Sequence, residues 1–178
     1  GTQNISGMQF VTDGYSLQNG TAGALNLVNG SLGNASIRVD PNATATLGVA
    51  LNGSGTLGKY DTGTLVLNTA NGYTGGTALN GGTLVVGDNA ALGTGVLTAA
   101  AGTTLDSNTA VSLANAMVLN GGLNIAGSNA LTLGGAISGA GGLIKSGAGS
   151  LTLNASNTYG GGTQLNGGTL ILGNNSAI

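Results

Sequence analysis

Short apolar runs alternate with threonine, serine and asparagine along the chain, and glycine, asparagine or aspartate separates one run from the next. Thr64-Leu65-Val66-Leu67 and Leu131-Thr132-Leu133 are typical runs. Such short alternation predicts β-strands with one buried face. Glycine and asparagine suit the corners between strands because they tolerate positive φ. Further strands are expected at residues 5–11, 15–17, 24–28, 36–39, 44–51, 95–98, 103–105, 111–113, 117–119 and 123–125.

The chain contains a long internal repeat. Residues 51–92 recur at residues 137–178 with an offset of 86 residues and no gap, and 22 of the 42 positions are identical. The repeat keeps apolar strand positions and Gly-Gly and Asn-Gly corners. Among charged residues it keeps one lysine, Lys59, which is matched by Lys145. A repeat that keeps strand faces and corners indicates a fold built by stacking.

The spacing of the expected strands is typical of a right-handed parallel β-helix, an all-β solenoid with three strands and about 20 residues in each turn. Eight or nine turns at about 4.8 Å each would make residues 1–178 a single rod of about 40 Å. The offset of 86 residues would then be about four turns. A β-sandwich or barrel is the rival, but it would have longer strands and no translational repeat. Since the second copy stops in mid-repeat at Ile178, we expect the solenoid to continue beyond one or both ends.

Composition argues against several classes of function. Charged residues are 4% of the chain, glycine is 37 of 178 residues, and histidine and cysteine are absent. Three basic residues cannot neutralise a row of phosphates, so no nucleic-acid partner is expected. The missing residue types exclude Ser-His-Asp and Cys-His triads and thiolate metal sites. No apolar run approaches the about 20 residues of a membrane-spanning helix, so no membrane insertion of this segment is expected.

Motifs that suggest chemistry are better explained by the high glycine content. Gly53-Ser-Gly-Thr-Leu-Gly58 and Lys59 match most of a phosphate-binding P-loop, but no helix pattern follows, and Tyr60 stands where a metal-binding serine or threonine belongs. No GGxGxD calcium motif occurs. We therefore predict no catalytic, cofactor-binding or metal-binding residue and no cofactor. A pair of carboxylates for carbohydrate cleavage is disfavoured because the aspartates are scattered, at Asp13, Asp40, Asp61, Asp88 and Asp106.

Four residues of the repeat are candidates for contact with a ligand or partner at the surface: Tyr73, Tyr159, Lys59 and Lys145. Each tyrosine lies beside a corner, where it could stack on a carbohydrate or pack its ring over the turn. The lysines are expected on one flank of the rod, as solvated corner residues. Threonine-rich faces such as Thr44-Ala45-Thr46 could order water, but no strict Thr-x-Thr ladder recurs along the sequence.

The repeat also resembles a known family. Its second copy is similar to the autotransporter-associated β-strand repeat of type V secreted passengers of Gram-negative bacteria, in Gly139-Ala-Gly-Gly-Leu-Ile-Lys-Ser-Gly-Ala-Gly-Ser-Leu-Thr-Leu153, Asn157-Thr-Tyr-Gly-Gly-Gly-Thr163 and Asn166-Gly-Gly-Thr-Leu170. Residues 5–17 resemble segments common in such passengers. The first copy departs at Tyr60-Asp61-Thr62, where the family favours small residues. The resemblance implies an extracellular β-helical passenger on the cell surface, whose repeats assist outer-membrane translocation by folding progressively outside.

These observations favour a non-enzymatic structural segment. It would be a rigid stalk that supports translocation and supports adhesion or homotypic self-association, end to end or side to side, since uncharged flanks and exposed strand edges favour such contact. A second hypothesis is an adhesin module that binds a glycan or host surface, or a subunit that stacks into an extracellular filament. An enzyme such as a polysaccharide lyase is the third.

Overall fold

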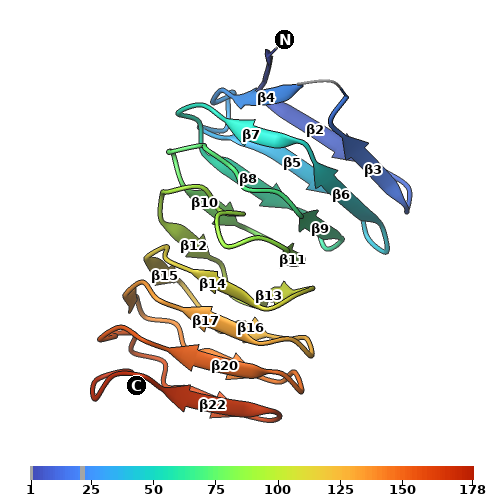
Figure 1. The fold of residues 1–178 in the computed structure, drawn as a ribbon. Helices are drawn as coiled ribbons and strands as arrows, with labels where there is room; N and C mark the ends of the chain where they lie inside the picture. Colours follow the sequence, from blue (N-terminus) through green and yellow to red (C-terminus); the bar gives the residue numbers. More distant parts are fainter. Residues whose placement is uncertain (1, 21–22) are drawn as a thin grey trace.

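Every regular element of the protein is a β-strand in the computed structural model, which describes residues 2–20 and 23–178. Figure 1 shows the strands stacked in successive turns from the amino-terminal to the carboxyl-terminal end. Neighbouring strands in each sheet are parallel. In the described ranges, no helix is long and apolar enough to cross a membrane. The predicted all-β parallel solenoid is therefore confirmed.

Each turn contributes to three faces of the solenoid. Face 1 consists of two sheets: β1 (Thr2–Ile5), β4 (Ala24–Leu27) and β7 (Ala50–Asn52), then β14 (Val111–Leu113), β17 (Leu131–Leu133), β20 (Ser150–Leu153) and β22 (Thr169–Leu172). Face 2 is a seven-stranded sheet of β2 (Gly7–Phe10), β5 (Ala35–Val39), β8 (Leu57–Tyr60), β10 (Thr77–Leu79), β12 (Leu97–Ala99), β15 (Met117–Leu119) and β18 (Ile137–Ser138). Face 3 is an eight-stranded sheet of β3 (Tyr15–Gln18), β6 (Thr44–Gly48), β9 (Thr64–Leu67), β11 (Thr83–Val86), β13 (Thr103–Ser107), β16 (Leu123–Ile125), β19 (Leu143–Lys145) and β21 (Thr163–Leu165).

The eight strands of face 3 correspond to about eight turns, at the lower end of the predicted eight or nine. Leu97 pairs with Met117, and Met117 pairs with Ile137, so a full turn takes 20 residues in this part of the chain. The predicted turn length is confirmed there, whereas the first turn is longer, since Gly7 pairs with Ser36 and Tyr15 with Ala45. Between its two sheets, face 1 is continued by two stretches without strands, where Gly72 N donates to Leu51 O and Thr94 N donates to Tyr73 O.

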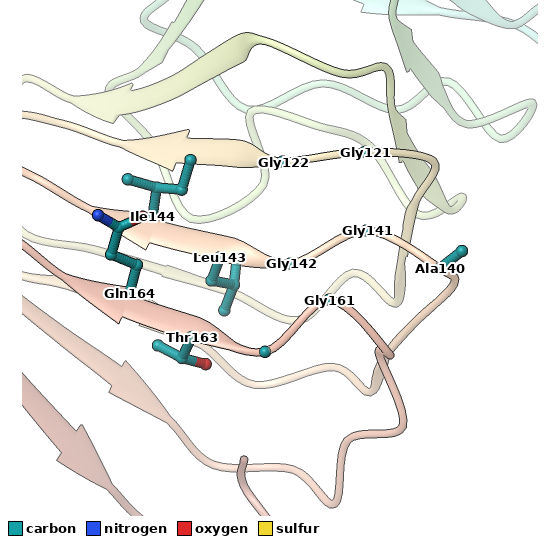
Figure 2. A pocket seen from close by; sticks show the side chains of 11 residues that line it. Gly121, Gly122, Ala140, Gly141, Gly142, Leu143, Ile144, Gly161, Thr163 and Gln164 are labelled. Carbon is teal, nitrogen blue, oxygen red and sulfur yellow. The ribbon is translucent and has the colours of Figure 1, made fainter.

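The corner between faces 2 and 3 is lined by glycine pairs in the later turns. Gly121-Gly122, Gly141-Gly142 and Gly161-Gly162 lie one above another there (Figure 2). A Cβ on Gly141 would lie 2.1 Å from the backbone oxygen of Gly121. Because the glycines of this corner have no side chains, successive turns can pack this closely.

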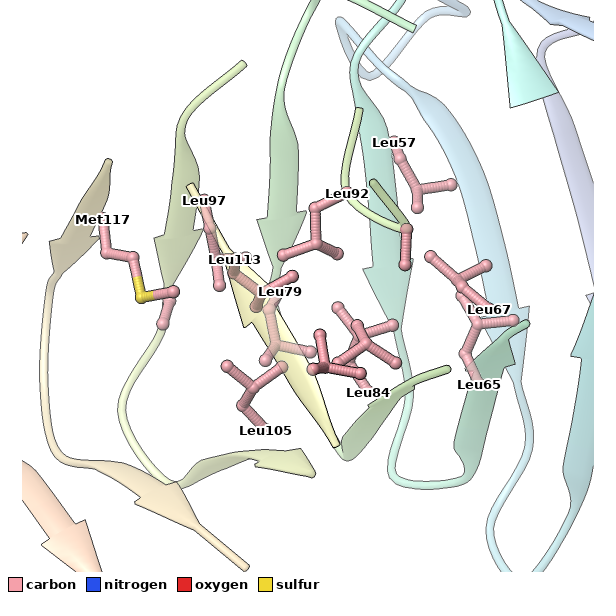
Figure 3. Close-up of a cluster of buried hydrophobic side chains, with 14 of the residues drawn as sticks. Leu57, Leu65, Leu67, Leu79, Leu84, Leu92, Leu97, Leu105, Leu113 and Met117 are labelled. Atoms are coloured by element: carbon pink, nitrogen blue, oxygen red, sulfur yellow. The ribbon is translucent and has the colours of Figure 1, made fainter. Parts of the chain in front are cut away.

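The hydrophobic core runs along the axis of the solenoid (Figure 3). Strand residues alternate between inside and outside, so each strand sends every second side chain inward. On face 3, one inward ladder runs through Leu65, Leu84, Leu105 and Ile125, which are paired in register and buried. Burial of each such side chain stabilises the fold by about 1.5–3 kcal/mol. This continuous core replaces the central core of a globular domain.

The two repeat copies do not lie on the same faces, which refines the predicted offset of about four turns. β8 on face 2 corresponds in sequence to β19 on face 3, and β9 on face 3 corresponds to β20 on face 1. The offset thus spans thirteen strand positions, counting the two strandless stretches of face 1, or four and a third turns. The physical reason is the 20-residue turn: an offset of 86 residues exceeds four turns by one short strand with its corner.

Candidate functional site

Lys59 is an inward-facing residue of β8 and is completely buried, with an exposed fraction of 0%. It occupies a rung of an otherwise aliphatic ladder, between Ile37 of the preceding turn and Leu79 of the following turn. Its Nζ donates to the backbone oxygens of Tyr60 at 2.9 Å, Asp61 at 2.8 Å and Gly81 at 3.1 Å. The ammonium group therefore contacts two successive corners between faces 2 and 3.

Lys145 repeats this arrangement on another corner. It extends the face 3 ladder after Ile125, is 1% exposed, and donates from Nζ to Gly147 O. A Cβ on Gly168, in the corner of the next turn, would lie 2.8 Å from the same Nζ. Lys59 and Lys145 thus hold equivalent corners of their own copies, on different faces. The prediction of two solvated lysines on one flank is wrong, because alternation within each strand directs both side chains into the core.

Burial changes the acidity of both lysines. Removal from water disfavours the charged ammonium and lowers the pKa of Lys59 to about 8, while the negative charge of Asp61 acts in the opposite direction. Burial also lowers the pKa of Lys145. In the second copy Gly147 stands in place of Asp61, so Lys145 has no equivalent carboxylate beside it.

The tyrosines of the repeat also turn inward. Tyr73 is fully buried, and its hydroxyl lies 2.7 Å from the hydroxyl oxygen of Thr77, which is buried as well. Tyr159 forms the same pair with Thr163 at 2.5 Å, although both residues are only partly buried. Burial raises the pKa of Tyr73 above its usual range. Since Tyr73 has no exposed surface, the prediction that it contacts a ligand at the surface is wrong.

An asparagine that the sequence analysis did not single out has a matching role in each copy. Asn71 accepts a hydrogen bond from Leu51 N at 2.8 Å through Oδ1 and donates through Nδ2 to Ala91 O at 2.6 Å. Asn157 connects Ile137 N and Ala177 O with the same two distances. Each asparagine therefore joins the turn before it to the turn after it. Its identity in both copies, beside a corner, was the signal available in the sequence.

The P-loop-like segment is part of the stacked backbone. A Cβ on Gly55 would lie 2.5 Å from the backbone oxygen of Leu27 in the preceding turn. Lys59 points into the core and not towards a phosphate at the surface. Among the described residues there is no group of three histidine, cysteine, aspartate or glutamate side chains that could hold a metal ion.

Three charged residues of the surface, Arg38, Asp40 and Asp61, lie near one another on faces 2 and 3. Arg38 Nη2 lies 2.8 Å from Asp61 Oδ1, and the guanidinium lies 5.9 Å from the centre of the Tyr60 ring. Asp40 accepts a hydrogen bond from Gln9 at 3.0 Å in the same part of the solenoid. Ion pairing accounts for the arginine and Asp61 without a catalytic role, and exposed pairs of this kind contribute at most about 1 kcal/mol.

A hollow of about 470 Å³ lies at the glycine corner between faces 2 and 3 (Figure 2). Backbone atoms of the glycine pairs form its floor, and Ile144, Thr163 and Gln164 lie beside it. The lining has no charged side chain. The polar side chains of its lining are those of Thr163 and Gln164.

The outward side of face 3 carries a file of threonines. Thr44, Thr64, Thr83 and Thr104 are paired in register in four consecutive turns. The neighbouring file changes from Thr46 to valine and then to aspartate, so the Thr-x-Thr pattern of β6 does not continue in these turns. Across these two files and four turns, Asp106 is the one charged side chain.

Comparison with known proteins agrees with this geometry. The model of the passenger-associated-transport-repeat family matches the chain twice, at residues 57–86 and 143–172. These are the segments from β8 to β11 and from β19 to β22. The chain is also 45% identical over 111 residues to the adhesin BmaC autotransporter of Brucella suis biovar 1 (strain 1330). That match covers 58% of this chain and 3% of the length of the adhesin. No solved structure matches the chain.

Proposed function

We propose that this chain forms a rigid, non-enzymatic stalk within a longer autotransporter passenger, because two of its segments match the passenger-associated-transport-repeat family and 58% of it is similar to part of an autotransporter adhesin. The passenger would be secreted across the outer membrane of a Gram-negative bacterium and displayed on the cell surface. The inward direction of the repeat's polar residues is the observation that carries this proposal. Lys59 and Asn71 donate hydrogen bonds to the next turn, and the Tyr73 hydroxyl pairs with that of Thr77 inside the fold. In the second copy, the equivalent lysine, asparagine and tyrosine also form hydrogen bonds inside the stack.

The same geometry supports progressive folding during export. Successive turns bond to each other through strand ladders spaced about 20 residues apart, so a turn finds its backbone hydrogen-bond partners in its immediate neighbours. The stability of such an array is approximately a sum of turn and neighbour terms. Each turn that forms outside the cell would therefore add its own stabilisation and oppose return of the chain.

Mechanical unfolding of the purified chain tests this mechanism. We expect force applied to its ends in optical tweezers to release the solenoid in steps, with increments of one or a few 20-residue turns. Refolding should proceed by the same increments after the force is lowered. A single rupture that releases all turns together would contradict progressive folding, because it would show that no partial stack is stable.

Adhesion is the second part of the proposal, and the adhesin name of the similar Brucella protein supports it. The outward side of face 3 is a place where this segment could contact a glycan or host surface. We expect beads coated with the chain to adhere to host cells, and substitution of Thr64 and Thr83 by lysine to reduce their adhesion. Equal adhesion by the substituted and original chains would show that face 3 is not the contact surface.

Self-association is a further candidate for the same segment. Leu165, Leu172 and Ile178, in the last described turn, have exposed fractions of 53%, 49% and 65%. These aliphatic side chains would be covered if another turn or a second copy stacked on them. Light scattering across concentration, with negative-stain electron microscopy, distinguishes filaments of stacked copies from a monomeric spacer. A monomer at all concentrations would limit this segment to the stalk role.

A further inference from the structure

The stalk proposal does not explain why two of the residues that connect the turns carry a positive charge in the core. Lys59 and Lys145 lie inside the solenoid, where an unpaired charge is costly and an aliphatic residue would continue each ladder. We propose that each repeat contains an internal cation site, built from backbone carbonyl oxygens of successive corners and filled by the repeat's own lysine, which fastens one turn to the next. The site is independent of where the protein is displayed.

In the first copy, the number of hydrogen-bond acceptors around the ammonium equals its number of donors. A lysine ammonium has three N–H donors and no acceptor, and three carbonyl oxygens lie within 3.1 Å of Lys59 Nζ. Tyr60 O and Asp61 O belong to the corner after β8, whereas Gly81 O belongs to the corner after β10, one turn later. We call these three oxygens the carbonyl cage. The cage is complete only when the second turn has been stacked on the first.

The second copy shows that the carbonyl oxygens, and not a carboxylate, are the common feature. Gly147 replaces Asp61, yet Lys145 remains buried and donates to the carbonyl oxygen at that same position. Its Nζ also lies beside Gly168 of the next corner. In the first copy the carboxylate of Asp61 is already bonded to Arg38. Backbone geometry, which side-chain changes leave in place, thus defines the site.

The chemistry of the cage predicts what it would accept in place of the lysine. Carbonyl oxygens are hard ligands that can replace the water around a monovalent cation. In a Lys59→Ala variant the cage would face an apolar channel vacated by three carbon atoms and one nitrogen. Propylammonium supplies the same atoms, with an apolar chain for the channel and three N–H donors for the cage.

Chemical rescue of Lys59→Ala is the decisive experiment. We expect the variant to unfold at a lower temperature than the wild type, and propylammonium chloride to raise this temperature along a saturable curve. Tetramethylammonium chloride at the same concentration is the matched control, because it has the charge but no N–H donor. Lys59→Met is the second control, since its side chain fills the channel and should prevent rescue. Equal effects of the two salts on Lys59→Ala, or a Lys59→Met variant as stable as the wild type, would overturn the proposal.

Two further measurements keep the test decisive if Lys59→Ala does not fold. The same rescue applies to Lys145→Ala, since Lys145 Nζ donates to Gly147 O in a corner that is followed by fewer turns of this chain. In the unmodified protein, nitrogen-15 NMR should show slowly exchanging ammonium protons for both lysines. The bonded and buried Nζ groups lack the access to water that makes exposed lysine protons exchange fast. Fast exchange at both lysines would contradict the cage directly.

Discussion

Replacement of Tyr73 by phenylalanine tests whether the repeat's inward polar pairs stabilise the stack. The change removes one hydroxyl and leaves Thr77, whose side chain is 2% exposed, without its partner at 2.7 Å. A buried polar group that loses its partner costs about 1–3 kcal/mol. For a chain of this size, that corresponds to a fall in the unfolding temperature of about 2–4 °C for each kcal/mol. We therefore expect Tyr73→Phe to be measurably destabilised although no cavity forms.

The repeat supplies a matched control for this change. Tyr159→Phe removes the same hydroxyl from the equivalent pair with Thr163, but both residues are partly exposed, so water can take the place of the lost partner. The expected cost is below about 1 kcal/mol. The double variant Tyr73→Phe with Thr77→Val removes both polar groups and should recover most of the stability lost in the single variant.

Urea unfolding followed by circular dichroism gives these free energies if the transition is two-state, and amide hydrogen exchange at β10 reports the local effect if it is not. The reasoning would be refuted if the two tyrosine variants had equal stability, since burial would then make no difference. It would also be refuted if Thr77→Val further destabilised Tyr73→Phe, because the two hydroxyls would then have separate roles.

Three other predictions concern the corners and the core. The pKa of Lys59 in the folded protein is about 8, below its ordinary value of 10.5, so on raising the pH the folded protein releases this proton before the unfolded chain does. The free energy of unfolding of the protein should therefore rise between pH 8 and 10. Urea titrations should show a weaker rise for Lys59→Met. Gly141→Ala, which sets a Cβ against backbone, should lower the unfolding temperature more than Gly102→Ala, where the space is open and only the positive φ of 75° opposes the change; equal effects would contradict the close stacking. Leu84→Ala, in the middle of the face 3 ladder, should cost about 2–5 kcal/mol in chemical denaturation, whereas Val96→Ala at an exposed position should cost far less.

The solenoid architecture could be predicted from the sequence because the signals for strands and corners lie within a few neighbouring residues. Alternation in Thr64-Leu65-Val66-Leu67 directs Leu65 and Leu67 inward, as the structure has them, and glycine corners mark where each strand ends. The turn length followed from the spacing of such runs. The position of the second copy around the axis did not, because it depends on the exact residue count of every corner. An error of two residues per turn moves a strand to another face after four turns.

The candidate site could be predicted in its residues but not in their direction. Lys59 and Lys145 are candidates because both repeat copies contain the lysine. Charged side chains are usually exposed to solvent, so the sequence alone favours an outward direction for both. The alternation Leu57-Gly58-Lys59 contained the contrary signal, since it puts the lysine on the same side as Leu57. What the sequence could not provide is the ring of carbonyl oxygens that makes burial of an ammonium tolerable. This carbonyl cage exists only after the corners of two successive turns have been stacked.

The offset of four and a third turns has a consequence for the shape of a long passenger. If further copies followed at the same spacing, each would be rotated by about a third of a circle from the one before, and three would complete about thirteen turns before returning to the first face. Small irregularities that every copy introduces, such as its lysine corner and its strandless stretch, would then be distributed evenly around the axis. Their tendencies to bend the shaft would cancel, so a repeat that is unsymmetrical by itself would give a straight fibre.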